Sequence, residues 1–234
     1  MAKMTKRSKA WAGKIDREKQ YTLTEAVSML KEFASAKFDE SVEIALNLNI
    51  DTRKADQQVR GMISLPHGTG RTVRVAVFAK GDAAAAAEKA GADIVGADDL
   101  AAKVEKGFLD FDAVVATPDC MPLMGRIGKI LGPKGLMPNP KLGTVTPTPE
   151  KMVKDLKSGM IEYRAEKNGV VHIMAGKSSF KEAQIAENIQ KFFDTIKTGK
   201  PSGVKGIFMK GMAISSTMGP GIKVDMSTVM GEAK

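Results

Sequence analysis

The stretch SVEIALNLNID, residues 41–51, places a large aliphatic side chain at every second position. These positions are Val42, Ile44, Leu46, Leu48 and Ile50. A period of two over this length is typical of a strand with one buried face and one open face. The stretch therefore predicts a sheet that is covered on one side, as in α+β proteins.

The residues on both sides of this strand continue an α+β pattern. Thr22 and Glu25 have the spacing of a capping box, which predicts the start of a helix within residues 21–34. Lys167-Asn168-Gly169 has the residue types of a tight turn, so we expect a hairpin over residues 161–176. The other expected elements are a strand over 59–66, a helix over 181–200 that ends at Gly199, and strands within 203–216 and 221–225.

The middle of the chain has a different character. VRVAVFA, residues 73–79, is a compact apolar run that suits a strand buried on both faces. Strands over 93–97 and 112–118 are expected to alternate with helices over 82–92, 98–110 and 148–159. Strands that alternate with helices predict a parallel α/β sheet. We therefore expect two domains, an α+β domain of residues 1–66 and 160–234 and an inserted α/β domain of residues 67–159.

The net charge of +9 and the isoelectric point near 9.5 favour a polyanionic partner, although solubility alone is an equally simple explanation of the charge. The excess charge is unevenly distributed. Residues 67–159 hold 13 Lys and Arg against 11 Asp and Glu, a net of +2, which leaves +7 for the terminal segments. If a polyanion binds, the α+β domain is the better candidate.

Several classes of site are unsupported by the residues present. One cysteine, Cys120, rules out an internal disulfide, and two separated histidines, His67 and His172, make a soft-metal site implausible. No catalytic constellation, metal or cofactor is expected, because neither histidine has a nucleophile or carboxylate partner that the sequence supports. The chain lacks a signal peptide and a span of roughly 20 apolar residues, so we expect no membrane association and an intracellular location.

GRIGKILGPKGLMPNP, residues 125–140, has the composition of a phosphate-holding loop. It lacks the Gly-Lys-Ser/Thr end of a Walker loop, and it contains no dinucleotide fingerprint. The segment Gly132–Gly135 matches the short G-x-x-G motif of KH domains, but four residues are weak evidence and a turn between elements is the better explanation. A nucleotide-binding enzyme that uses the 125–140 loop is therefore the alternative hypothesis.

Five motifs in order carry a resemblance to a known family. They are KFDES (37–41), SLPHGTG (64–70), FDAVVATPD (111–119), LGPKGLMPNPK (131–141) and STMGPG (216–221). From about residue 3 to residue 225 the chain resembles the bacterial L-one family of large-subunit ribosomal proteins. The resemblance implies a discontinuous domain with a split β-α-β, RNA-recognition-like sheet, and an inserted Rossmann-like, three-layer α/β domain.

The resemblance also implies a function without catalysis or cofactors. Members bind ribosomal RNA at the mobile side stalk near the tRNA exit site, help release deacylated tRNA, and repress translation by binding their own messenger leader. The implied partners are ribosomal RNA, the messenger leader, exit-site tRNA and other ribosomal components, in the cytoplasm, with a monomer when free. The implied RNA-binding residues are Lys37, Phe38, Asp39, Glu40, Ser41, Lys54, Arg164, Lys167, Asn168, Thr217, Met218 and Gly219. The implied hinge residues are Pro66, His67, Gly68, Gly159 and Met160.

Overall fold

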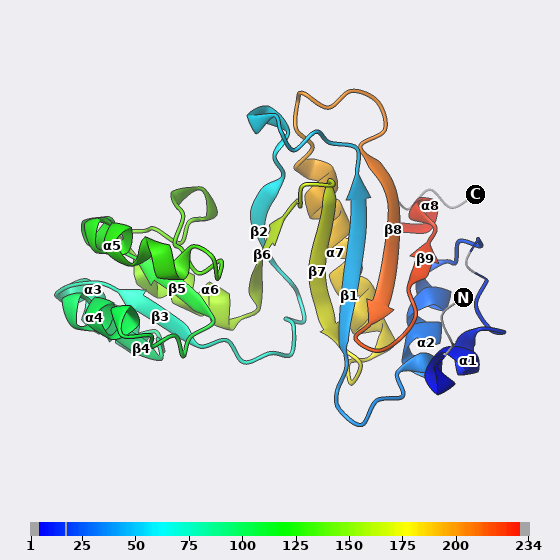
Figure 1. Ribbon diagram of the computed structural model, residues 1–234, viewed down its shortest axis with the longest axis horizontal. Coiled ribbons are helices and arrows are strands. Elements are labelled where there is room, and N and C mark those ends of the chain that lie inside the picture. Colours follow the sequence, from blue (N-terminus) through cyan, green and yellow to red (C-terminus); the bar gives the residue numbers. More distant parts are fainter. Residues whose placement is uncertain (1–4, 17, 230–234) are drawn as a thin grey trace. The chain divides into compact units, whose positions relative to one another are not determined.

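The computed structural model describes residues 5–16 and 18–229 as a mixed α/β fold with several sheets (Figure 1). The chain divides into two compact units. Unit 1 comprises Met1–Gly70 and Tyr163–Lys234, and unit 2 comprises Arg71–Glu162. Each unit has its own sheet, so each is described by itself.

The sheet of unit 1 is built around the strand that the alternating stretch predicts, β1 (Ser41–Leu48). The strand order is β7-β1-β8-β9, with β7 (Val170–Lys177), β8 (Met209–Ser216) and β9 (Ile222–Val224), and all neighbours are antiparallel. Ile44 lies opposite Ile173 on one side and Ile214 on the other. The aliphatic side chains of β1 are buried, and Glu43 and Asn47 are exposed on the other face.

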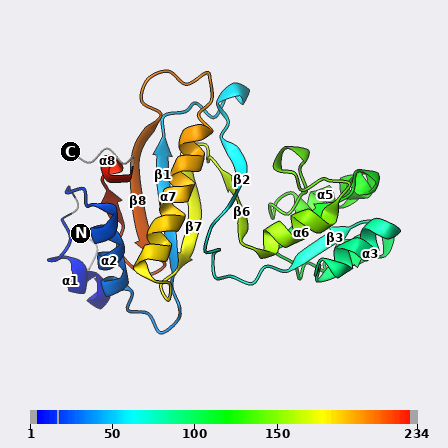
Figure 2. The same cartoon turned by 180° about the vertical axis from the view of Figure 1, so that it is seen from behind.

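Two helices, α2 (Leu23–Phe33) and α7 (Glu182–Thr198), cover one face of this sheet (Figure 2). The capping box is confirmed, because Thr22 Oγ1 accepts from the N–H of Glu25 and the Glu25 carboxylate accepts from the N–H of Thr22. β7 and β8 are both antiparallel to β1, so β7-α7-β8 is a β-α-β unit whose two parallel strands are separated by β1.

The predicted hairpin over residues 161–176 forms only beside its turn, where Ala165 bridges Val171 and the N–H of Glu166 donates to Val170 O (2.9 Å), and it does not continue along the strands. β6 (Met160–Arg164) pairs with β2 (Arg60–Ser64) in a separate two-stranded sheet, while β7 pairs with β1. The turn itself forms, since the N–H of Gly169 donates to Glu166 O (2.8 Å) and Gly169 has a φ of 77°. The two strands then diverge, because β7 pairs with the equally aliphatic β1 and the apolar face of the resulting sheet is buried against α7.

Unit 2 has a parallel sheet of order β4-β3-β5. Its elements are β3 (Val75–Phe78), β4 (Ile94–Gly96), β5 (Ala113–Ala116), α3 (Asp82–Lys89), α4 (Asp98–Glu105), α5 (Met121–Leu131) and α6 (Pro149–Lys157). Helices α4 and α5 pack against each other, and so do α3 and α6. Ala76 and Phe78 of β3 join the core on the α4–α5 side, whereas Val75 and Val77, also fully buried, alternate to the opposite face.

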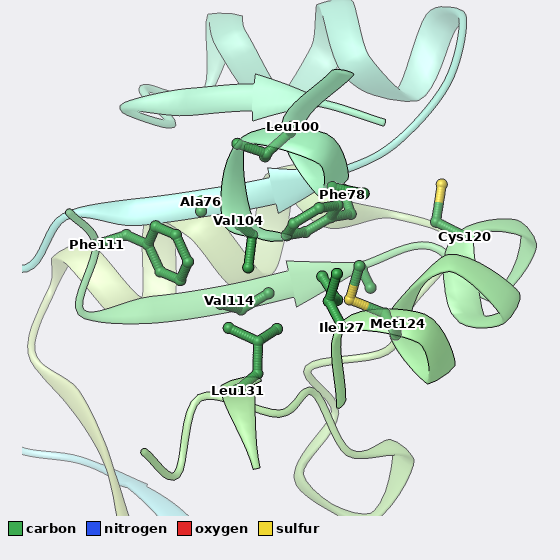
Figure 3. Close-up of a cluster of buried hydrophobic side chains, with 12 residues drawn as sticks. Ala76, Phe78, Leu100, Val104, Phe111, Val114, Cys120, Met124, Ile127 and Leu131 are labelled. Carbon is green, nitrogen blue, oxygen red and sulfur yellow. The ribbon is translucent and has the colours of Figure 1, made fainter. Parts of the chain in front are cut away.

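Helix α5 was missed by the sequence interpretation, which treated residues 125–140 as a loop. Met124, Ile127 and Leu131 recur at helical spacing and are fully buried against Phe78 and Val104 (Figure 3). Burial of this stripe outweighs the low helix propensity of the glycines in the segment. The remaining short elements are α1 (Lys6–Trp11), α8 (Met226–Val229) and the 3₁₀ turns Ala55–Gln57, Pro118–Cys120 and Pro140–Leu142.

The expected hinge at Pro66, His67 and Gly68 is not a free linker. Asn188, fully buried in α7, accepts from the N–H of His67 (3.2 Å) and donates to Gly68 O (3.0 Å) and Ala175 O (2.7 Å). These bonds fix the segment to unit 1. In the other expected hinge, Gly159 ends α6 with a φ of 101° and Met160 begins β6.

The chain leaves unit 1 at Gly70 rather than at the expected Pro66. Thr69 is buried in unit 1, and Arg71 donates to Asp112 of unit 2 (3.0 Å). The first of the two chain connections between the units therefore passes through Gly70, which has a φ of 71°. A substituent at Gly70 would lie 2.9 Å from Phe180.

Substitution Asn188→Ala is expected to destabilise unit 1 by about 2–4 kcal/mol, because it leaves two carbonyls and one N–H without their side-chain partner. Urea unfolding followed by a probe in unit 1 measures this. Asn47→Ala, on the open face of β1, is the control and is expected to change stability by less than about 0.5 kcal/mol. Equal effects of the two substitutions would contradict the anchoring role of Asn188.

Candidate nucleic-acid interface

Two of the loops singled out in the sequence meet at one end of β1. The N–H of Ser41 donates to Thr217 Oγ1 (3.0 Å), and the N–H of Thr217 donates to Ser41 O (3.0 Å). These bonds extend the β1–β8 pairing by one residue beyond Ser216. Residues 37–41 and 217–219 therefore form one continuous surface, which we call the Met218 surface.

The carboxylate of Glu40 holds the two loops together. Glu40 is 1% exposed and accepts from the N–H groups of Met218 (3.0 Å) and Ala36 (2.9 Å). Burial alone would raise the pKa of Glu40, but the hydrogen bonds to the carboxylate outweigh it, and the pKa lies below its ordinary value. Glu40 was expected to contact RNA; because its oxygens face inward, it positions the loops instead.

Asp39 is also bonded within the protein. Its carboxylate accepts from the hydroxyls of Ser178 (2.9 Å) and Ser179 (2.9 Å) and from the N–H of Ser179 (3.1 Å). The Ser178 hydroxyl is the largest of the causes that hold the pKa of Asp39 below its ordinary value. These bonds fix the segment between β7 and α7 to the same site, and Lys177 Nζ, at the end of β7, donates to Ser41 Oγ (3.3 Å).

Held in this way, the loops present apolar side chains to solvent. Phe38 is 55% exposed and Met218 is 47% exposed, and Lys37 beside them is also exposed. A Cβ at Gly219 would lie 2.3 Å from Ser216 Oγ, so a side chain there would displace that hydroxyl. A flat ring and a thioether on a rigid loop, next to a cation, can stack on nucleobases and contact phosphate.

Helix α1 borders the Met218 surface and was not predicted. A hollow of about 710 Å³ separates α1 from the start of β9, and its lining includes Trp11 and Pro220. The charge of Arg7 is among the influences that lower the pKa of Glu40, after burial and the hydrogen bonds. The only local signal was Thr5, whose hydroxyl accepts from the N–H of Ser8 as an N-cap, in a helix of six residues.

The other expected RNA-binding residues lie elsewhere in unit 1. Arg164, Lys167 and Asn168 line an open groove of about 890 Å³, which we call the Arg164 groove. Thr52 also lines it and donates to Lys167 O (2.8 Å), and Lys54 lies in the adjoining turn. Further lining residues are Gln58, Val59, Arg60, Ala165 and Glu166.

The structure does not bring these residues to the Met218 surface. The N–H of Leu48 donates to Gly169 O (2.9 Å), so the Arg164 groove lies near the last residue of β1. The Met218 surface lies at its first residue, Ser41. A strand of eight residues spans about 23 Å at roughly 3.3 Å per residue, so unit 1 offers two separate surfaces.

The geometry of residues 125–140 argues against the nucleotide-binding alternative. Phosphate cradles place a glycine-rich loop before a helix N-terminus, where the dipole is positive. Here Gly125 and Gly128 lie inside α5, and Gly132 and Gly135 lie at its C-terminal end. In the described part of the chain no group of three or more His, Cys, Asp or Glu side chains could hold a metal ion. No helix among those residues is long and apolar enough to cross a membrane.

A model of the Ribosomal protein L1p/L10e family matches residues 30–220, a range that contains both loops of the Met218 surface. This chain belongs to the ribosomal L-one family. The Large ribosomal subunit protein uL1 of Proteus mirabilis is 54% identical over 229 residues, which cover 98% of each chain. Proteins of the same name from Actinobacillus succinogenes and Photobacterium profundum are 53% and 54% identical, again over 98% of this chain.

The family inferred from the five sequence motifs is thereby confirmed. The L-one family consists of structural ribosomal proteins, and its relatives match nearly the whole chain rather than one unit of it.

The depressed pKa of Glu40 predicts a pH-dependent contribution to stability. This contribution is complete above the unfolded pKa of about 4.3 and is lost as the pH falls through the lower folded pKa. Glu40→Gln is expected to destabilise unit 1 by about 1.5–3 kcal/mol at neutral pH, with a difference from wild type that shrinks below about pH 4. Urea midpoints across this pH range test it, with Glu43→Gln on the exposed face of β1 as the control. A difference that is independent of pH would contradict the role of the ionised carboxylate.

Proposed function

We propose that this chain is a non-enzymatic component of the large ribosomal subunit that binds ribosomal RNA through the Met218 surface. The observation that carries the proposal is the exposure of Phe38 and Met218 on loops locked together by buried Glu40. Family membership and the printed names of the relatives support the ribosomal location. Within the family, the position is the mobile side stalk near the tRNA exit site.

The charge of unit 1 supports it as the RNA-binding domain. Unit 1 holds 23 Lys and Arg against 15 Asp and Glu, a net of +8, whereas unit 2 has 13 against 12. Because Glu40 is buried and the exposed carboxylate of Asp39 already accepts hydrogen bonds from Ser178 and Ser179, Lys37, Phe38 and Met218 are the groups of the Met218 surface that remain available to RNA. Phe38 and Met218 stack on unpaired bases, Lys37 contacts phosphate, and the Thr217 loop reads the shape of the RNA fold.

The two separated surfaces allow two RNA partners at once. We assign the Met218 surface to ribosomal RNA and, in competition with it, to a similar fold in the chain's own messenger leader. The Arg164 groove, at the other end of β1, is assigned to exit-site tRNA, whose release it assists. Its guanidinium and ammonium groups suit contacts to a phosphate backbone rather than to bases.

Phe38→Ala and Met218→Ala are each expected to weaken binding to a ribosomal stalk RNA fragment by about 1–3 kcal/mol, because each removes a stacking surface. Fluorescence anisotropy measures the affinity, and circular dichroism checks the fold. Ile207→Ala is the matched control, since Ile207 is 75% exposed and lies outside both surfaces. Wild-type affinity in both loop variants would disprove the assignment of the Met218 surface.

Arg164→Ala with Lys167→Ala is expected to weaken tRNA binding and to lower its salt slope by about two units, one for each phosphate interaction that the substitutions remove. Binding of the stalk RNA fragment is expected to stay within about twofold of wild type. Met218→Ala should show the reverse pattern. A loss of both RNAs in either variant would show that the chain has one continuous site instead of two.

A further inference from the structure

The charges of unit 2 are sorted along its sequence. Although the unit is close to neutral, the 30 residues from Cys120 to Pro149 contain Arg126, Lys129, Lys134 and Lys141 and no Asp or Glu. The rest of unit 2 holds nine Lys and Arg against twelve Asp and Glu, a net of −3. A small domain divided in this way has a positive part around α5 and a negative remainder.

The four cations of this segment are also free of ion pairs. Elsewhere in unit 2 cations are paired, as in Arg74–Asp112 (3.3 Å), Lys80–Asp98 (2.9 Å) and Lys157–Asp93 (3.2 Å). Among the residues that the structure describes, the four side chains from Arg126 to Lys141 are exposed and form no such pair. Their charge is therefore available to an external anion.

The exposed face of α5 is cationic and lacks large apolar side chains. Met124, Ile127 and Leu131 define the buried face. At 100° per residue, Arg126 and Lys129 project from the opposite face together with the exposed Pro122 and Gly125. A protein-docking helix would present an apolar stripe there, so this face suits a polyanion better.

The turn after α5 holds Lys134 on a fixed backbone. The N–H of Gly132 donates to Gly128 O (2.8 Å), and the N–H of Leu136 donates back to Leu131 O (3.1 Å). Gly135 has a φ of 72°, and a Cβ there would meet no described atom within 4 Å. The backbone around Lys134 is therefore ordered and open to close approach.

Neutralisation of the helix dipole does not explain the three cations in and just after α5, which are Arg126, Lys129 and Lys134. The C-terminus of a helix carries roughly half a negative charge, which one lysine in the last turn offsets. Solubility does not explain their clustering either, because dispersed charges would serve it equally well. A run of 30 residues with four exposed cations, no acidic residue and no ion pair among the described residues suits an anionic ligand.

We propose that Arg126, Lys129 and Lys134, here called the α5 cationic surface, bind the phosphate backbone of the RNA that unit 1 recognises. This inference rests on the proposed function of unit 1. Contacts of this kind carry no sequence information but add affinity, since the linked units reach the same RNA at high effective concentration.

The test is a triple substitution of the full chain, Arg126→Ala, Lys129→Ala and Lys134→Ala. Affinity for the ribosomal stalk RNA fragment is measured between about 50 and 200 mM KCl, where phosphate contacts change the affinity most. We expect the salt slope to fall by up to about three units, one for each cation that no longer meets a phosphate. Lys89→Ala, Lys103→Ala and Lys106→Ala, which change the same charge at exposed positions of unit 2 outside the segment, form the matched control.

A reduced slope in the α5 variant with a wild-type slope in the control supports the proposal. Equal slopes in all three proteins would overturn it and leave the α5 cationic surface to an acidic protein partner. Equal reductions in both variants would also overturn it, because net charge alone would then explain the effect. If wild type itself fails to bind the fragment, the proposed function of unit 1 fails first, so the two failures are distinguishable.

Discussion

The buried carboxylate of Glu40 is the interaction on which the Met218 surface depends. A carboxylate without water is costly unless it is hydrogen-bonded, and here Ala36 and Met218 supply backbone donors from two loops far apart in the sequence. Because the bonds form only when both loops are in place, the charge that is expensive to bury also specifies their arrangement. Phe38 and Met218 can therefore remain exposed, because the loops that carry them are held by the bonds of Glu40.

Strand β1 constrains the distance between the Met218 surface and the Arg164 groove. It pairs with β7 and β8 along almost its whole length, so its two ends are held at a fixed separation by the most regular part of unit 1. One end joins the 217–219 loop and the other joins the turn at Gly169. A central strand that is paired on both sides is stiffer than any loop, and two loop-built surfaces attached to it keep their spacing.

The sequence predicts local elements better than it predicts their partners. Alternation identified β1 because half of its side chains are buried, and the Thr22–Glu25 capping box fixed the start of α2. The Gly169 turn was also found, but the pairing of β7 with β1 was not, since strand pairing depends on distant residues. Helix α5 was missed because its glycines lower the local propensity that burial of Met124 and Ile127 restores.

The sequence is also a poor guide to which side chains of the candidate site are exposed to a partner. KFDES contains one basic and two acidic residues, and read as composition it is a poor surface for RNA. In the fold, Glu40 is buried, whereas Lys37, Phe38 and Asp39 are exposed, with the Asp39 carboxylate bonded to Ser178 and Ser179. Residue types along the chain fix the total charge, whereas the direction of each side chain fixes the field that a partner meets. Motif resemblance located these loops, but only the structure shows that Glu40 is buried and that the exposed Asp39 carboxylate is bonded to two serines of the same chain.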